Sequence, residues 1–171
     1  MSRVALSIGS NIDAPHYIAL ALEALSRRYG KLTTSSIYES EAVGFVGGNF
    51  LNLVVLLETE QALAELNECL KTLEAEHGRR QGQPRFSART LDIDVLCYGD
   101  LQGKHGGIQL PRAEITQNAF VLQPLAEVAG AELHPPTGKT YAQLWQAYDK
   151  SRQRLWPIDF EWRGELISRR G

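Results

Sequence analysis

The sequence predicts an α+β protein of the ferredoxin-like type, with helices on one face of an antiparallel sheet. The main observation is that apolar residues follow strand spacing and helix spacing in the order β-α-β-β-α-β. The length of 171 residues suits one domain with one hydrophobic core. The composition, 43% hydrophobic and 22% charged, is normal for a globular protein. We therefore expect a single domain over residues 1–171.

The first half of the chain supplies a strand, a helix and two more strands. Residues 4–8 are apolar and are followed by the turn residues Gly-Ser-Asn. Residues 15–29 carry apolar side chains at helical spacing, and Gly30 would cap this helix. Residues 33–38 and residues 50–59 are rich in strand-forming residues. These two segments are therefore the second and third strands of the predicted order.

The remaining core elements follow the third strand. Residues 39–49 contain three glycines and are expected to form a mobile loop. Leucines at helical spacing predict an amphipathic helix over residues 62–76. A polar, basic segment, residues 77–90, leads to the last core strand at residues 91–98. Residues 101–109 are glycine-rich, which favours a hairpin or loop.

Two short helices are expected after the core, near residues 124–129 and 141–148. The pattern of residues 150–171 predicts no defined element, so we treat this segment as a C-terminal extension. Its Trp156 and Trp162 indicate that it packs on another part of the protein.

Charge and cysteine content narrow the functional classes. The formal net charge is −2, which gives no electrostatic reason for binding nucleic acid or a membrane. Cys69 and Cys97 lie in apolar runs outside any metal-binding pattern, so two buried thiols in a reducing cytoplasm are expected. The chain has no run of about 18 apolar residues and no signal-peptide pattern. We expect a cytoplasmic protein, a monomer or a weak homodimer.

Two aspartates on one strand form the most informative pattern. Asp92 and Asp94 are two residues apart, so their side chains project from one face, while Leu91, Ile93 and Val95 face the core. Two like charges at this spacing repel by roughly 1 kcal/mol even in a wet environment, so a positive partner is expected. Magnesium prefers hard oxygen ligands, including one or two carboxylates with substrate phosphates. The alternative is an exposed face whose aspartates pair with nearby arginines.

A basic segment precedes the aspartates. Arg79, Arg80, Arg85 and Arg89 are interleaved with glycine and proline. Arginine offers a planar set of donors that suits phosphate oxygens, and glycines permit the segment to close over a ligand. A solvated surface loop is the alternative. The chain has neither a P-loop nor a G-x-G-x-x-G motif, so any nucleotide would be held by side chains and metal.

Several segments also share order and spacing with one known family. They are residues 8–11 (Ile-Gly-Ser-Asn), 38–40 (Tyr-Glu-Ser), 50–52 (Phe-Leu-Asn), Glu74 with Gly78-Arg79, 89–94 (Arg-Thr-Leu-Asp-Ile-Asp), 110–111 (Leu-Pro) and 119–125 (Ala-Phe-Val-Leu-Gln-Pro-Leu). Over roughly residues 3–135 the chain resembles the 6-hydroxymethyl-7,8-dihydropterin pyrophosphokinases.

This resemblance implies a ferredoxin-like fold and an activity in folate biosynthesis. The β,γ-pyrophosphoryl group of ATP would pass to the pterin hydroxymethyl oxygen, and AMP would leave. Asp92 and Asp94 would ligate two Mg²⁺ ions that bridge the triphosphate, and Arg79 and Arg89 would be catalytic with them. The expected ATP-binding residues are Glu74, Arg79, Arg89, Val95 and Arg112.

The resemblance also implies a pterin pocket. Phe50 and Phe120 would stack on the flat heterocycle, and Asn52 would bind its polar edge with an amide that both donates and accepts. Backbone groups near Ser40 and Val43 would complete the pocket. The alternative for the two phenylalanines is core packing. Asn52 stands in an otherwise apolar strand, and a buried amide needs partners.

The sequence departs from the family pattern at phosphate-contacting positions. Arg112 stands where a histidine is expected, and Asn118 stands where an arginine is expected. Gln81 and Gly82 replace residues that are often basic, and Phe86 replaces a tryptophan found in some members. These departures leave two other hypotheses open. One is a slow or non-catalytic pterin- or nucleotide-binding paralogue, and the other is an interaction domain whose aspartates are structural.

Overall fold

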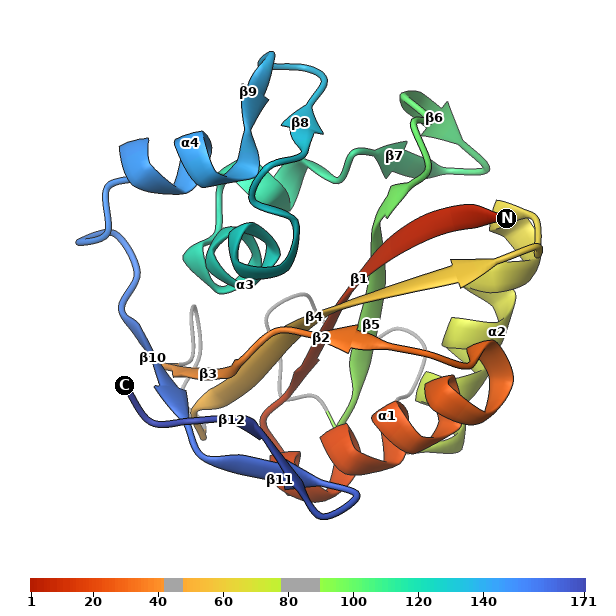
Figure 1. Cartoon of the computed structure of the whole chain (residues 1–171). Helices are drawn as coiled ribbons and strands as arrows, with labels where there is room; N and C mark the ends of the chain where they lie inside the picture. Colours follow the sequence, from red (N-terminus) through yellow and green to blue (C-terminus); the bar gives the residue numbers. More distant parts are fainter. Residues whose placement is uncertain (42–47, 78–89) are drawn as a thin grey trace.

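An antiparallel sheet forms the centre of the protein in a computed structural model that describes residues 1–41, 48–77 and 90–171 (Figure 1). The strands lie in the order β10-β3-β4-β1-β5, and the short β2 also pairs with β4. The strands are β1 (Ser2–Ser10), β2 (Thr33–Thr34), β3 (Ile37–Ser40), β4 (Phe50–Thr59), β5 (Asp92–Tyr98) and β10 (Leu155–Ile158).

Two long helices cover one face of the sheet, namely α1 (Ala14–Tyr29) and α2 (Leu63–Glu76). On α1 the apolar stripe of Ile18, Leu22 and Leu25 is buried, as its helical spacing predicts. Alternate residues of β1, β4 and β5 pack in the same core cluster. The order β1-α1-β3-β4-α2-β5 and the strand positions confirm the predicted ferredoxin-like fold.

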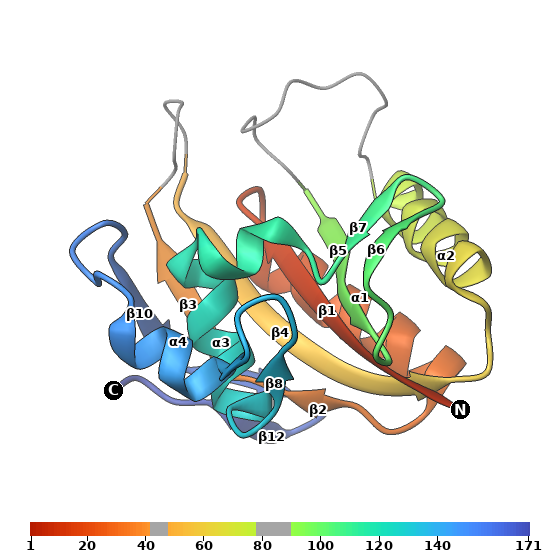
Figure 2. The same ribbon diagram turned by 90° about the horizontal axis from the view of Figure 1, so that it is seen from above.

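A second helical layer covers the opposite face, a placement that the sequence pattern does not predict (Figures 1 and 2). It consists of α3 (Ala119–Ala129) and α4 (Tyr141–Ala147), whose apolar residues pack on Ala5, Val54 and Leu96 of the sheet. The prediction of helices on one face holds for the core helices α1 and α2, whereas the two helices expected after the core form a layer on the other face. The reason lies in β4, which buries both of its faces and so needs a layer on each side.

Several predicted boundaries also differ from the structure, and β1 continues through Gly9 and Ser10, which were expected to form the turn after it. Residues 33–38 form two short strands instead of one, because Ser35 and Ser36 interrupt the ladder with side-chain hydrogen bonds. The last residues of β3, 39 and 40, belong to a strand instead of a loop. The helix predicted near residues 124–129 begins at Ala119, with Pro124 inside it.

Small hairpins and one turn of 3-10 helix connect these layers. The Gly-rich segment expected to be a hairpin or loop forms the β6-β7 hairpin, and a second hairpin, β8-β9, precedes α4. The elements are β6 (Gly103–His105), β7 (Ile108–Leu110), η1 (Ala113–Thr116), β8 (Leu133–His134) and β9 (Lys139–Thr140).

The C-terminal segment packs along the β3 edge of the sheet. Its first strand, β10, pairs with β3, and the hairpin of β11 (Phe160–Trp162) and β12 (Glu165–Ser168) lies beside α1 (Figure 1). Phe160 enters the α1/α2 core, and the Ser168 hydroxyl accepts a hydrogen bond of 2.8 Å from the Ile37 amide. Arg163 in the hairpin turn forms two hydrogen bonds with the Glu23 carboxylate. The segment is thus fastened to the sheet and to α1.

Both cysteines are free thiols, and each is half-buried where full burial was expected. Among the described residues, no helix has the length and apolar content needed to cross a bilayer.

Candidate functional site

One row of residues crosses four strands on the face of the sheet that α3 covers. Directly opposed residues of neighbouring strands project to the same face. Tyr38 opposes Asn52, and Asn52 opposes Gly9. Gly9 in turn opposes Asp92, and Val54, two residues after Asn52, packs against α3. Because adjacent strands lie about 4.8 Å apart, one strand alone separates the predicted pterin-binding amide from the first aspartate.

The two aspartates project from β5 onto this same face. Ile93 and Val95 are fully buried in the α1/α2 core, so Asp92 and Asp94 lie on the opposite side of the strand. Asp94 opposes Ser7 of β1, and its side chain is 32% exposed. Both carboxylates are therefore half-buried and reachable from solvent, as a metal site requires.

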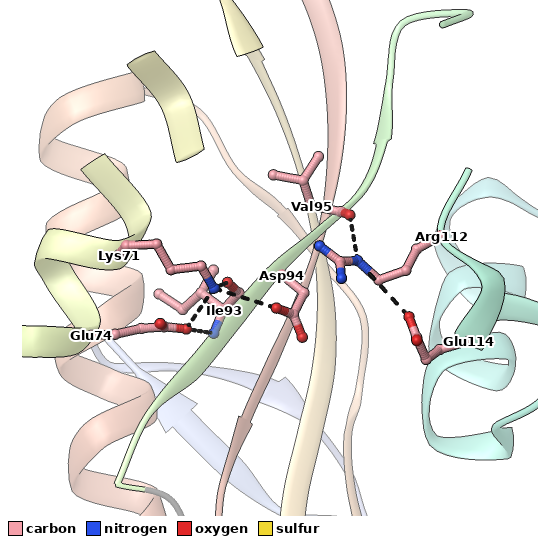
Figure 3. A network of polar contacts seen from close by, with 7 residues as sticks. All are labelled: Lys71, Glu74, Ile93, Asp94, Val95, Arg112 and Glu114. Atoms are coloured by element: carbon pink, nitrogen blue, oxygen red, sulfur yellow. Dashed lines mark hydrogen bonds and ion pairs between the residues drawn. The ribbon is translucent and has the colours of Figure 1, made fainter. Parts of the chain in front are cut away.

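A network of charges from α2 holds the edge of β5 (Figure 3). The buried Glu74 carboxylate accepts a hydrogen bond of 2.6 Å from the Ile93 amide. The Lys71 ammonium donates to the Ile93 carbonyl at 3.0 Å and lies 3.2 Å from Glu74 Oε2. It also lies 3.4 Å from Asp94 Oδ1. Side chains thus satisfy both backbone groups that Ile93 presents at this free strand edge.

The electrostatics around Asp94 disfavour its charged form. Burial is the largest cause that raises the pKa of Asp94, and the nearby charge of Asp92 raises it further. The positive charges of Lys71 and Arg112 lower the pKa and offset part of this effect. Figure 3 shows Asp94 between these two cations, one from each side of β5. An added divalent cation would therefore be favoured here.

The donor set fits magnesium better than a transition metal. Among the described residues, no group of three or more His, Cys, Asp or Glu side chains could hold a metal ion. Asp92 and Asp94 offer carboxylate oxygens, which match the one or two protein carboxylates that Mg²⁺ usually takes. The remaining positions would then belong to water and substrate phosphates.

Asn52 has the properties of a ligand-binding amide. Its side chain is 6% exposed, and its Oδ1 atom has no hydrogen-bond partner in the described part of the chain. An unpaired buried carbonyl costs roughly 1–3 kcal/mol, so such groups usually mark a missing partner. Asn52 can occupy this position because its strand neighbour is Gly9. A Cβ atom at Gly9 would lie 2.6 Å from Asn52 Nδ2.

The predicted stacking residues lie on the same face as Asn52. Phe50 opposes Ser40 and precedes Asn52 by two residues, and it is half-buried. Phe120 lies in the first turn of α3 and packs partly against the core cluster of that layer. Phe120 therefore contributes to core packing, as the alternative interpretation of the two phenylalanines predicts. Stacking of a pterin between the two rings stays a prediction.

Two of the departures from the family pattern, Arg112 and Asn118, have structural partners. Arg112 donates from Nε to the Val95 carbonyl at 3.0 Å, and its Nε lies 3.9 Å from a Glu114 carboxylate oxygen. Asn118 is the N-cap of α3, and its Oδ1 accepts a hydrogen bond of 2.9 Å from Gln153 Nε2. Arg112 therefore lies close to the aspartates, whereas Asn118 is engaged with the C-terminal segment.

Val43 and the four arginines of the basic segment, Arg79, Arg80, Arg85 and Arg89, lie outside the described residues, as do Gln81, Gly82 and Phe86. Two residues at the site were not predicted from the sequence. Lys71 precedes Glu74 by one helical turn, and this spacing could have indicated their pairing. The role of Gly9 depends on the register of β1 and β4, which the sequence pattern does not specify.

Removing the Glu74 carboxylate should destabilise the protein. We expect Glu74→Ala to lower the free energy of unfolding by about 1–3 kcal/mol, because the buried Ile93 amide loses its acceptor. Glu74→Gln retains an acceptor oxygen and serves as the matched control. Urea denaturation checks this, and equal stability of the alanine variant and the wild type would contradict it.

The fold and the site define an α+β protein of ferredoxin-like topology with a carboxylate pair beside a buried amide. The family profile described as 7,8-dihydro-6-hydroxymethylpterin-pyrophosphokinase (HPPK) matches residues 5–130. The chain belongs to this family.

Relatives with the name 2-amino-4-hydroxy-6-hydroxymethyldihydropteridine pyrophosphokinase cover most of the chain. The Aquifex aeolicus protein is 34% identical over 137 residues, which are 79% of this chain and 85% of that protein. The Porphyromonas gingivalis protein is 37% identical over 143 residues, 79% of this chain and 95% of that protein. For the Synechocystis protein, 34% identity extends over 72% of this chain but 62% of that protein.

The fold also matches solved structures. A Plasmodium falciparum HPPK-DHPS triple mutant with SDX-DHP superposes with a TM-score of 0.72 at 14% identity, covering 92% of this chain and 45% of that one. At this identity the match supports the fold alone. The chain spans less than half of that protein.

Proposed function

We propose that this protein transfers the pyrophosphoryl group of ATP to 6-hydroxymethyl-7,8-dihydropterin in folate biosynthesis, with release of AMP. The observation that carries this proposal is the row that joins Asn52, Gly9 and Asp92 across three strands. It places a buried amide with an open acceptor beside a carboxylate pair. Family membership supports the same activity, since the named relatives are pyrophosphokinases.

The reaction is a displacement at the β-phosphorus of ATP. The pterin hydroxymethyl oxygen forms the new bond to this phosphorus, and the bond from the phosphorus to the α,β-bridging oxygen breaks. AMP leaves with that oxygen, and the hydroxyl proton passes to solvent or a nearby base. Such transfers depend mainly on positioning and on stabilisation of charge.

The chain's own residues would divide this work. Asn52 would orient the pterin by its polar edge, and Phe50 and Phe120 would hold its faces. Two Mg²⁺ ions, held by Asp92 and Asp94, would supply charge neutralisation on the triphosphate. We assign Glu74, Val95 and Arg112 to the nucleotide side, together with Arg79 and Arg89. Ser40 and Val43 would contribute backbone groups to the pterin side.

Arg112 supports the nucleotide assignment. Its guanidinium lowers the pKa of Asp94 and therefore lies within electrostatic reach of the carboxylate pair. A guanidinium there can replace the positive charge of the family's histidine, because it presents several donors to phosphate oxygens. We also propose a cytoplasmic enzyme that acts as a monomer or weak homodimer on small-molecule substrates.

The test is AMP formation from ATP, measured by chromatography. We expect one AMP for each pterin consumed, with no AMP when either Mg²⁺ or the pterin is omitted. ADP formation would contradict the proposal, because it would indicate transfer of a single phosphoryl group. Pterin binding by calorimetry without any AMP would instead support the non-catalytic paralogue.

A further inference from the structure

The side chain of Gln153 joins the C-terminal segment to the first turn of α3. Its Oε1 accepts a hydrogen bond of 2.8 Å from the Ala119 amide, and its Nε2 donates to Asn118 Oδ1 at 2.9 Å. The N-cap Asn118 makes no side-chain cap hydrogen bond of its own. The first amides of a helix lack partners within the helix. Gln153 therefore acts as a cap for α3 from 35 residues away along the chain.

This contact fixes the part of α3 that carries the predicted stacking ring. Phe120 directly follows Ala119 and packs partly against the core cluster that α3 and α4 form with Ala5, Val54 and Leu96, on the sheet face that also holds Asn52. A second contact from the same region holds the residues just before α3. The Tyr148 hydroxyl donates a hydrogen bond of 2.8 Å to the Gln117 carbonyl. The start of α3 is thus held by two side chains that precede β10.

The same segment also holds the opposite wall of the predicted pterin pocket. Two residues after Gln153, Leu155 pairs with Ser40 at the end of β3. The Trp156 indole donates to the Glu39 carboxylate at 2.8 Å. Residues 153–156 therefore contact β3 at Ser40 and α3 at Ala119, two of the elements that carry predicted pterin-binding residues.

The far end of the segment is anchored independently. Phe160 is buried in the α1/α2 core, and Arg163 pairs with Glu23 of α1 at 2.7 Å. This anchoring means that loss of the Gln153 contacts would leave the segment in place. A substitution of Gln153 would then alter the position of the first turn of α3 and leave the rest of the fold unchanged.

We propose that Gln153 is a positioning residue of the acceptor site, which sets the first turn of α3 and thereby the Phe120 ring against the sheet. The inference rests on the proposed function, since it assigns the acceptor pocket to the space between β3, β4 and α3. The inference goes further than the proposed function, because it predicts that the C-terminal segment contributes to the affinity for the pterin. Gln153 acts through Phe120 and does not itself need to touch the pterin.

The test compares three single variants of the full-length protein. Gln153→Ala removes both contacts. Gln153→Glu keeps the acceptor for the Ala119 amide, and the Asn118 amide can turn round so that its Nδ2 donates to the second carboxylate oxygen. Gln146→Ala, at an exposed position on α4, is the control. Calorimetry gives the Kd for the pterin, and steady-state kinetics give the KM for the pterin and for ATP. Hydrogen exchange is measured at the Ala119 and Phe120 amides.

We expect Gln153→Ala to weaken pterin binding about tenfold, because a displaced Phe120 ring would lose an aromatic contact of about this size. The KM for ATP should change less than twofold, and the two amides should exchange faster. Gln153→Glu should bind the pterin nearly as well as the wild type. In a Phe120→Ala background, Gln153→Ala should have little further effect, because the residue through which it acts is gone.

An unchanged pterin Kd in Gln153→Ala would overturn the inference. Equal losses for pterin and ATP with a lower Tm would also overturn it, because they would indicate a purely structural role. Failure of the proposed function is distinguishable: the wild type would then form no AMP. In that case the pterin Kd and the exchange rates would still decide whether Gln153 positions a pterin site.

Discussion

Replacing Asp94 by asparagine is expected to lower kcat by about 10³-fold or more, with the fold intact. A bound divalent ion contributes several kcal/mol of charge stabilisation to phosphoryl chemistry, and each ~1.4 kcal/mol corresponds to a factor of ten in rate. Asparagine keeps the size of the side chain but removes the charge that attracts the ion. Initial rates of AMP release at saturating Mg²⁺ measure the effect, and Asp92→Asn should behave alike.

The control for this prediction is Asp100→Asn, which removes an exposed aspartate just beyond β5. It should retain full activity. We expect the Tm of metal-free Asp94→Asn to be no lower than that of the wild type at pH 7. The reason is that Asp94 is partly buried near Asp92, and both effects make its charge unfavourable. Wild-type turnover by Asp94→Asn would show that the ion does not bind at this pair.

The alternation of side chains along a strand made the carboxylate pair of the site predictable. A strand places residues i and i+2 on one face, so Asp92 and Asp94 could be paired from the sequence alone. By the same alternation Ile93 and Val95 were predicted to face the core, and both are buried. The role of Lys71 was not predicted, because its Ile93 and Asp94 contacts depend on where α2 packs along the β5 edge.

Elements with strong periodicity were predicted well, and elements held by distant contacts were not. The boundaries of β4 match residues 50–59, and those of α2 match the prediction within one residue. The α3 helix was predicted too short because Pro124 suggests a helix start, yet the helix begins five residues earlier. Its first turn depends on Gln153, which local sequence cannot reveal.

The C-terminal strands illustrate the same limit. Leu155, Trp156 and Ile158 form a strand because β3 offers a free edge, while Pro157 within them argues against one. Proline is tolerated there because β10 is itself the sheet's outer strand, and this arrangement also protects that edge from further pairing. The formation of β10 therefore depends on hydrogen bonds to β3 more than on the strand propensity of its own residues.

Gly9→Ala is the second change with a large expected effect, and it acts on the acceptor site alone. The added Cβ would lie 2.6 Å from Asn52 Nδ2, closer than atoms can approach. The Asn52 side chain can rotate away, so the fold should survive while the amide leaves its place. We expect kcat/KM for the pterin to fall by about 10- to 100-fold, which corresponds to roughly 1.5–3 kcal/mol of lost polar contacts.

A double-mutant cycle with Asn52→Ala isolates this cause. Asn52→Ala alone should weaken pterin binding by a similar factor, because the amide itself is lost. In that background no Nδ2 atom remains to be displaced, so adding Gly9→Ala should cost less than a further twofold. Independent, multiplying effects of the two changes would mean that Gly9 is needed for some other reason. Our inference that Gly9 makes room for the Asn52 amide between the strands β4 and β5 would then be wrong.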